Sequence, residues 1–154
     1  MKQVILDKIP FQLNRNQLLN KLRVEPSSED KVQILSMADY AEQIGRPKAM
    51  YALSFIDSKQ ENEAVVDGIK LQSRVMRVNF AKVNRVFPYI ATCGRELSEW
   101  AAGQEELLEQ YWADMILEQA LATALKFFYE QLEKVYQLGK CKSMNPGSLE
   151  DWPI

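Results

Sequence analysis

The chain has 154 residues with 47% hydrophobic content, which is enough for one domain with a buried core. Its formal net charge of −2 gives no overall field that would attract nucleic acid or an anionic membrane. The sequence contains no histidine, which excludes Ser-His-Asp and Cys-His hydrolases and histidine-ligated zinc. Six scattered glycines form no phosphate-binding loop, which argues against an independent kinase.

The N-terminal third predicts one short strand followed by two helices. Residues Gln3–Leu6 form an apolar run typical of a strand, and Asn14 can cap a short helix. A second helix is expected to begin at Ser27 and to end at Gly45. Apolar residues recur along it at helical spacing and predict its buried face: Ile34, Ala38, Ala41 and Ile44.

The middle of the chain predicts strands with one short helix between them. Lys48–Ile56 is expected to be a strand with apolar residues on both faces, and Arg85–Cys93 is expected to be another. Asp67-Gly68 between two strand-like runs predicts a hairpin at 64–71 with a type I′ turn. Between the hairpin and the last strand, Ser73–Val83 is expected to be helical, with three apolar residues turned inward: Val75, Phe80 and Val83.

The stretch from Leu97 to Leu138 contains no proline and is expected to be mostly helical. Seven residues near helical spacing predict its buried stripe: Leu108, Tyr111, Met115, Leu125, Phe128, Leu132 and Val135. Strands and helices follow one another without a regular βαβ rhythm. The sequence therefore predicts an α+β fold, with a mixed or antiparallel twisted sheet, the hairpin at 64–71, and a long C-terminal helix packed on the sheet.

The expected compartment is the cytoplasm. Residues Met1–Pro10 lack the apolar core of a secretory signal, and no run of about 20 apolar residues occurs. The two cysteines, Cys93 and Cys141, are accordingly expected to be reduced thiols.

One stretch is basic although the chain as a whole is slightly acidic. Between Gly68 and Arg95 there is no acidic residue, and there are five basic ones: Lys70, Arg74, Arg77, Lys82 and Arg85. This pattern is typical of a solvated helix face, and the alternative is a docking patch for an acidic partner. Nucleic-acid binding is not expected, since the stretch lacks an identifiable aromatic platform and the overall charge is negative.

The last fourteen residues differ from the rest of the chain. Pro146 fixes its own φ and Gly147 can take a positive φ, so a type II turn is expected there. Such a turn presents backbone N–H groups without a side chain in the way, which suits a small polar ligand. Glu150 and Asp151 could then pair with an ammonium or sulfonium charge. The alternative is a plain surface turn with Trp152 placed on the core.

This terminal segment resembles the loop after the long helix in the reactivation domain of cobalamin-dependent methionine synthase. There the pattern Arg-x-x-Pro-Gly-Tyr-Pro binds S-adenosylmethionine. The segment is more similar still to small stand-alone relatives in anaerobic bacteria, which read Met-Asn-Pro-Gly-Ser-Leu-x-Asp-Trp-Pro-Ile. Four further segments with counterparts in those relatives extend the resemblance over nearly the whole chain: Ile9–Phe11, Ser73–Val75, Arg85–Leu97 and Tyr111–Asp114.

The resemblance implies an α+β domain that binds S-adenosylmethionine and holds it over a cobalamin or other corrinoid carried by a partner. In that family, an electron from a reduced flavodoxin-like donor and a methyl group from S-adenosylmethionine restore methylcobalamin after oxidation to Co(II). The implied partner is a corrinoid-binding protein or a methionine synthase module. Because the cofactors supply the chemistry, no turnover is expected from this chain alone.

Carried over residue by residue, Pro146 and Gly147 fall on the family's Pro-Gly pair. Ser143 stands at the arginine position and Ser148 at the tyrosine position, and both are departures from the family pattern. Lys142 can meet a carboxylate only as a point charge. The resemblance implies a cofactor-binding set of five residues and no catalytic or metal-binding residue: Lys142, Asn145, Pro146, Gly147 and Ser148.

The whole sequence, residues 1–154, is expected to form a single activation-like domain that stops before the family's last helix and strands. A sheet edge left open by that early stop would favour a homodimer. The early stop and the two serine departures also favour a second interpretation of function. In it, the chain is a non-catalytic partner module that docks on a corrinoid protein or methyltransferase without binding S-adenosylmethionine.

Overall fold

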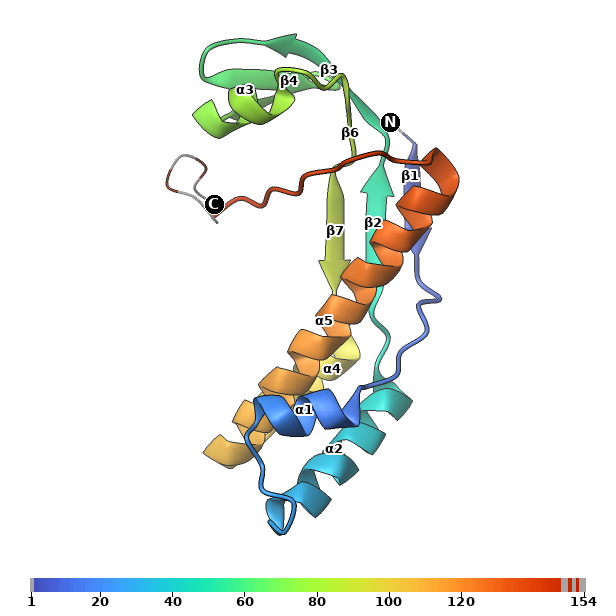
Figure 1. Cartoon of the computed structure of the whole chain (residues 1–154), viewed down its shortest axis with the longest axis vertical. Coiled ribbons are helices and arrows are strands. Elements are labelled where there is room, and N and C mark those ends of the chain that lie inside the picture. Colours follow the sequence, from blue (N-terminus) through green and yellow to red (C-terminus); the bar gives the residue numbers. More distant parts are fainter. Residues whose placement is uncertain (1, 148–149, 151, 153–154) are drawn as a thin grey trace. The chain divides into compact units, whose positions relative to one another are not determined.

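The computed structural model describes residues 2–147, 150 and 152, and these residues form two compact units (Figure 1). The helical unit comprises residues 5–50 and 90–136, and the sheet unit comprises residues 2–4, 51–89 and the described part of 137–154. The helical unit contains four helices: α1 (Arg15–Lys21), α2 (Asp30–Ile44), α4 (Arg95–Ala102) and α5 (Leu107–Tyr136). The sheet unit contains α3 (Arg74–Phe80). The α+β class and the long C-terminal helix are confirmed.

The described strands form two antiparallel sheets. The four-stranded sheet has the order β5-β4-β3-β6 and lies in the sheet unit. Its strands are β3 (Ser54–Lys59), β4 (Glu63–Val66), β5 (Ile69–Gln72) and β6 (Arg85–Val86). The three-stranded sheet has the order β1-β2-β7. Its strands are β1 (Gln3–Leu6), β2 (Lys48–Ala52) and β7 (Tyr89–Thr92).

The hairpin predicted at 64–71 is confirmed. Strands β4 and β5 pair antiparallel with Val66 opposite Ile69, which leaves two residues in the turn. Asp67 has a φ of 46° and Gly68 a φ of 78°. Two consecutive positive φ values are what a type I′ turn requires, and its twist matches that of the flanking strands.

Two predicted strands are each split in the structure. Lys48–Ile56 is divided at Leu53 into β2 and β3, which belong to different sheets. Arg85–Cys93 is divided at Phe87 and Pro88 into β6 and β7, also in different sheets. Pro88 has no N–H to donate to a ladder, while its carbonyl still accepts a hydrogen bond from Ala52 N at 3.1 Å.

The helix boundaries agree with the sequence in part. Asn14 caps α1 as expected, its side chain accepting the N–H of Gln17 at 3.0 Å. The second helix begins at Asp30 rather than Ser27. The predicted helix Ser73–Val83 is shorter and covers Arg74–Phe80.

The stretch from Leu97 to Leu138 is two helices rather than one. Gly103 ends α4 by donating its N–H to the carbonyl of Glu99 at 3.1 Å, and α5 begins at Leu107. A glycine disfavours a helix interior, so this position suits a break.

The predicted buried stripe of the long helix is wrong at both ends. Leu108 is 51% exposed, Tyr111 49% and Val135 59%, whereas Phe128 and Leu132 are buried as expected. The side chains of α5 that are buried include several small ones: Trp112, Ala113, Ile116, Gln119, Ala120, Ala124, Phe128 and Leu132. In α3 the buried residue is Met76 rather than the three expected.

The core of the helical unit is one cluster shared by α1, α2, α4 and α5. Its buried members are apolar and come from both ends of the sequence: Leu13, Leu18, Ile34, Ala38, Ala41, Leu97, Trp112, Ile116 and Ala120. Of the expected inner face of α2, Ile34, Ala38 and Ala41 are buried, and Ile44 packs against the cluster. The small alanines let the helices approach closely, since interiors pack to high density.

A charged group beside this core links α1 to α2. The Arg15 guanidinium lies 2.5 Å from Asp39 Oδ1 and 3.0 Å from Glu42 Oε2, and Glu42 Oε1 accepts the N–H of Leu13 at 2.6 Å. The hydrogen bond from Arg15, aided by that from Leu13, holds the pKa of Glu42 below its ordinary value.

We expect Glu42→Gln to lower the free energy of unfolding at pH 7 and to lower it less at pH 3. A carboxyl whose pKa is lowered by folding stabilises the protein above its unfolded pKa, and this contribution is lost as the pH falls through the lowered value. Urea unfolding at both pH values measures it. Glu130→Gln, in an exposed pair with Lys126, is the control and should change stability little. An equal loss at both pH values would contradict the prediction.

Candidate functional site

The terminal loop, residues Gln137–Gly147, follows α5 and belongs to the sheet unit. The chain leaves the helix through Gln137, which has a φ of 49°. Hydrogen bonds then hold the loop to other parts of the unit. The hydroxyl of Tyr89 lies 2.9 Å from Ser143 Oγ and donates to Asn145 Oδ1 at 3.5 Å. Asn79 Nδ2 donates to Met144 Sδ at 2.7 Å.

These contacts explain which side of the loop meets solvent. Met144 is half-buried, whereas Lys142, Ser143, Asn145 and Pro146 are exposed. The residue that bonds to the thioether, Asn79, lies on α3. Tyr89, at the start of β7, contacts both flanking polar side chains and so fixes the loop on either side of Met144.

Gly147 has a φ of 79°, which is the positive value expected from the sequence for a glycine at this position. Its backbone N–H donates to the carbonyl of Trp152 at 2.7 Å, so this donor is used within the protein. Of the backbone N–H groups that the turn was expected to present, the one of Gly147 is therefore already bound to Trp152. What stays accessible to a ligand is the side-chain-free surface of Gly147 and the polar groups of its neighbours.

Four of the five predicted site residues, Lys142, Asn145, Pro146 and Gly147, lie together in the exposed part of the terminal loop. Ser148 lies outside the described residues. Tyr89 was not predicted as a site residue. Its signal was indirect, because it stands within the segment Arg85–Leu97 that has counterparts in the stand-alone relatives.

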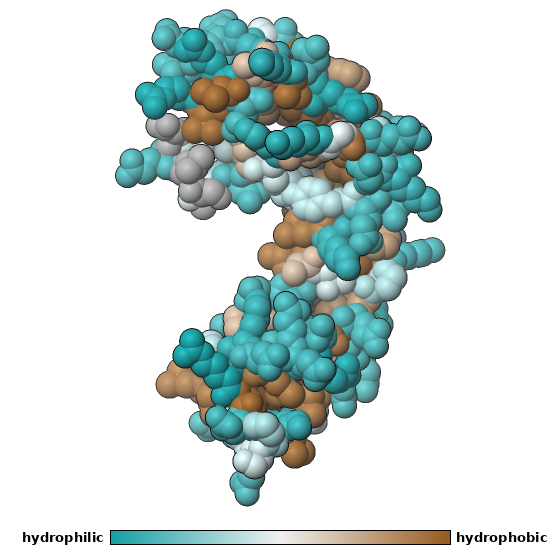
Figure 2. Space-filling model, viewed as in Figure 1, coloured by the Kyte–Doolittle hydropathy of each residue, from teal (hydrophilic) through white to brown (hydrophobic). Residues whose placement is uncertain are grey.

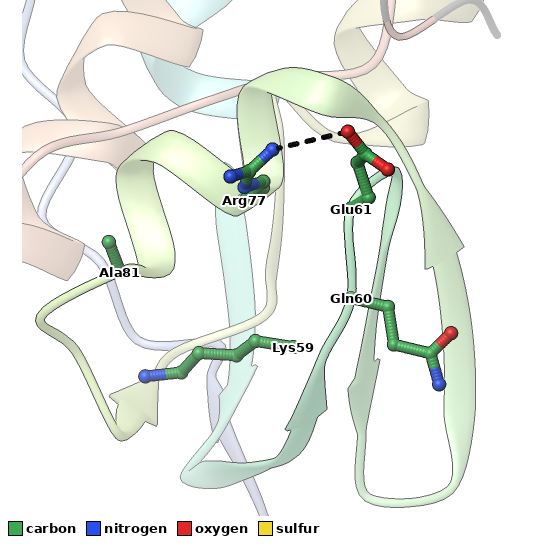
Figure 3. A pocket seen from close by; sticks show the side chains of 5 residues that line it. All are labelled: Lys59, Gln60, Glu61, Arg77 and Ala81. Carbon is green, nitrogen blue, oxygen red and sulfur yellow. Dashed lines mark ion pairs between the residues drawn. The ribbon is translucent and has the colours of Figure 1, made fainter.

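Two shallow hollows lie elsewhere on the sheet unit. One, of about 470 Å³, is lined by residues of β3, α3 and the turn after β3: Lys59, Gln60, Glu61, Arg77 and Ala81 (Figure 3). The other, of about 610 Å³, is lined by residues 60–63 and 72–74. Neither includes the terminal loop. In the first, Arg77 and Glu61 point toward each other at 3.8 Å, and both side chains are exposed.

Two further observations bear on the chemistry of the chain. Cys93 is half-buried and Cys141 exposed, and both carry free thiols. Among residues 2–147, 150 and 152, no three His, Cys, Asp or Glu side chains lie where they could hold a metal ion.

A separate finding concerns membranes. Within the described part of the chain, no helix combines the length and the apolar character needed to cross one.

Comparison with known proteins adds no identification. No protein-family model matches the chain, and no curated protein matches it.

Proposed function

We propose that this chain is an S-adenosylmethionine-binding activation factor, which supports the reductive methylation of a cobalamin or corrinoid protein such as methionine synthase. The proposal rests on the terminal loop. Its exposed polar residues are held by Tyr89 around a glycine at positive φ, which leaves an open surface for the polar end of a ligand.

The residues present fit the amino-acid end of S-adenosylmethionine. Lys142 is an exposed cation that can meet the ligand's carboxylate. The carbonyl of Asn145 and the carboxylate of Glu150 are acceptors suited to its ammonium group. The bound cofactor would supply a methyl group, and the chain would contribute position and shielding. A reduced flavodoxin-like donor would provide the electron.

A second candidate is favoured by one specific observation. Ser143 Oγ and the Gly147 N–H are both hydrogen-bonded within the protein, so two of the loop's polar groups are already satisfied. A loop of that kind is also suited to serve as part of a docking surface. In this alternative the chain is a partner module that recognises a corrinoid protein or methyltransferase without binding S-adenosylmethionine.

Calorimetric titration of S-adenosylmethionine separates the two candidates. We expect saturable binding with a dissociation constant on the order of micromolar, equivalent to about 8 kcal/mol. Gly147→Val should abolish it, because a β-branched residue at a φ of 79° must distort the turn. Gly139→Val is the matched control: no atom lies within 4 Å of a Cβ placed there, so binding should persist.

Tyr89→Phe tests the role of the loop's anchor. Removal of the hydroxyl loses the contacts to Ser143 and Asn145 and should weaken binding about five- to tenfold, the range expected for one hydrogen bond. Absence of heat up to millimolar ligand, with circular dichroism showing a folded protein, would rule out the cofactor role. Binding of the chain to a Co(II) cobalamin-carrying module, measured without S-adenosylmethionine, would then support the partner module.

A further inference from the structure

The start of α5 exposes an apolar helix face that the proposed function does not use. Leu107 is 83% exposed, Leu108 51% and Tyr111 49%. These residues make no part of the buried cluster of the helical unit, whose members on α5 begin at Trp112. Exposed leucines grouped in this way mark an interaction surface more often than isolated ones do.

Acidic residues surround this face. Glu105 and Glu106 precede it, and the exposed Asp114 lies on it, one turn after Tyr111. Glu109 lies on the opposite side of α5, where it accepts a hydrogen bond from Gln33 of α2, and it is not part of this face. We call this surface, Glu105–Leu108, Tyr111 and Asp114, the acidic face.

The sheet unit carries a surface of opposite charge. Along α3 and the residue that follows it, four exposed residues recur at spacings of three and four: Arg74, Arg77, Val78 and Ala81. Val78 is 72% exposed, so this surface also has an apolar centre. Lys59 and Lys82 are exposed and extend its positive charge. We call this surface, Lys59, Arg74, Arg77, Val78, Ala81 and Lys82, the basic face.

The charge difference extends to the whole of each unit. Counted over the sequence, the sheet unit has nine basic and six acidic residues, a net charge of +3. The helical unit has ten basic and fifteen acidic residues, a net charge of −5. In Figure 2, brown apolar residues lie among teal hydrophilic ones in both parts of the chain. Opposite charges around apolar centres favour association between such surfaces.

We propose that the acidic face binds the basic face of a second copy of this chain. The pairing is heterologous, because two different surfaces meet, and each copy keeps one face free for the next. It therefore differs from the strand-edge dimer expected from the sequence. The Arg77–Glu61 pair does not prevent it, since a 3.8 Å pair between exposed side chains is weak and easily exchanged. The inference goes beyond the proposed function and holds whether or not S-adenosylmethionine binds.

Charge reversal on each face tests the pairing. At about 20 mM salt, light scattering should show a mean mass that rises with protein concentration above the 17.8 kDa monomer and falls as salt is added. Arg77→Glu removes the basic face, and Glu106→Arg removes the acidic face. Each variant alone should weaken association at least about tenfold. Lys126→Glu, 80% exposed on α5 away from both faces, should associate as the parent does.

Mixing the two variants gives the decisive result. Each retains the face that the other lacks, so an equimolar mixture should form a complex of twice the monomer mass that grows no further. Circular dichroism confirms that each variant is folded. A parent chain that stays monomeric at every concentration and low salt would overturn the proposal. Variants that still associate like the parent, or a mixture that stays monomeric, would overturn it equally.

Discussion

Ile116→Ala is expected to destabilise the helical unit by about 3 kcal/mol, within the range for removing a fully buried large aliphatic side chain. Ile116 has no exposed surface and lies in the cluster with Leu18, Leu97 and Trp112. The alanine would remove three carbon atoms from a close-packed site. The neighbouring helices cannot fully close the resulting cavity.

Urea unfolding followed by tryptophan fluorescence measures this effect, because Trp112 lies in the same cluster. Val135→Ala is the matched control on the same helix. Its side chain is 59% exposed, so the expected change is within about 0.5 kcal/mol. Equal losses for the two variants would contradict the assignment of Ile116 to the core.

Gly94→Ala is the second substitution with a large expected effect, a loss of at least about 2 kcal/mol. Gly94 has a φ of 98°, where an L-residue is strained. A Cβ at this position would lie 2.6 Å from the backbone carbonyl oxygen of Arg46, within the helical unit. A backbone atom cannot rotate away as a side chain can, so the loop before α4 must shift.

Thermal unfolding of Gly94→Ala beside Gly139→Ala measures this cost. A Cβ at Gly139 meets no atom within 4 Å, so alanine there should be neutral or slightly stabilising, because it restricts the unfolded chain. A melting temperature for Gly94→Ala equal to that of the parent would show that the close approach to Arg46 relaxes without cost.

The sequence correctly predicted local structures that depend on only one or two residues. The Asp67-Gly68 turn depends on two residues that accept a positive φ, and the start of the first helix depends on the side-chain acceptor of Asn14. Both predictions are confirmed. The breaks at Leu53 and Pro88 were missed. Apolar residues continue through both positions, and a continuous apolar run cannot show that a strand changes sheets.

The face of α5 was predicted with less success for a related reason. The predicted stripe took apolar residues larger than alanine at helical spacing, and three of them, Leu108, Tyr111 and Val135, are exposed. The buried positions include Ala113, Ala120 and Ala124 beside larger residues, because small side chains let neighbouring helices pack closely. Hydrophobic size alone does not identify the inner face when the contact is between helices.

The sequence predicted which segment forms the candidate site, but not which distant residues contact that segment. The turn at Gly147 follows from residue type. The contacts of Tyr89 with Ser143 and Asn145 join residues more than 50 positions apart, and no local pattern encodes them.

The helical core also determines the order in which the chain can fold during synthesis. Its cluster includes both Leu13 and Ala120, so it stays incomplete until about the first half of α5 has left the ribosome. The pairings of β3, β4, β5 and β6, by contrast, lie within residues 54–86. Local contacts form fastest, so this sheet can assemble while the helical core is still incomplete. Part of the apolar surface of Leu18 and Ile34 therefore stays uncovered in the nascent chain until α5 follows, and such a surface favours aggregation.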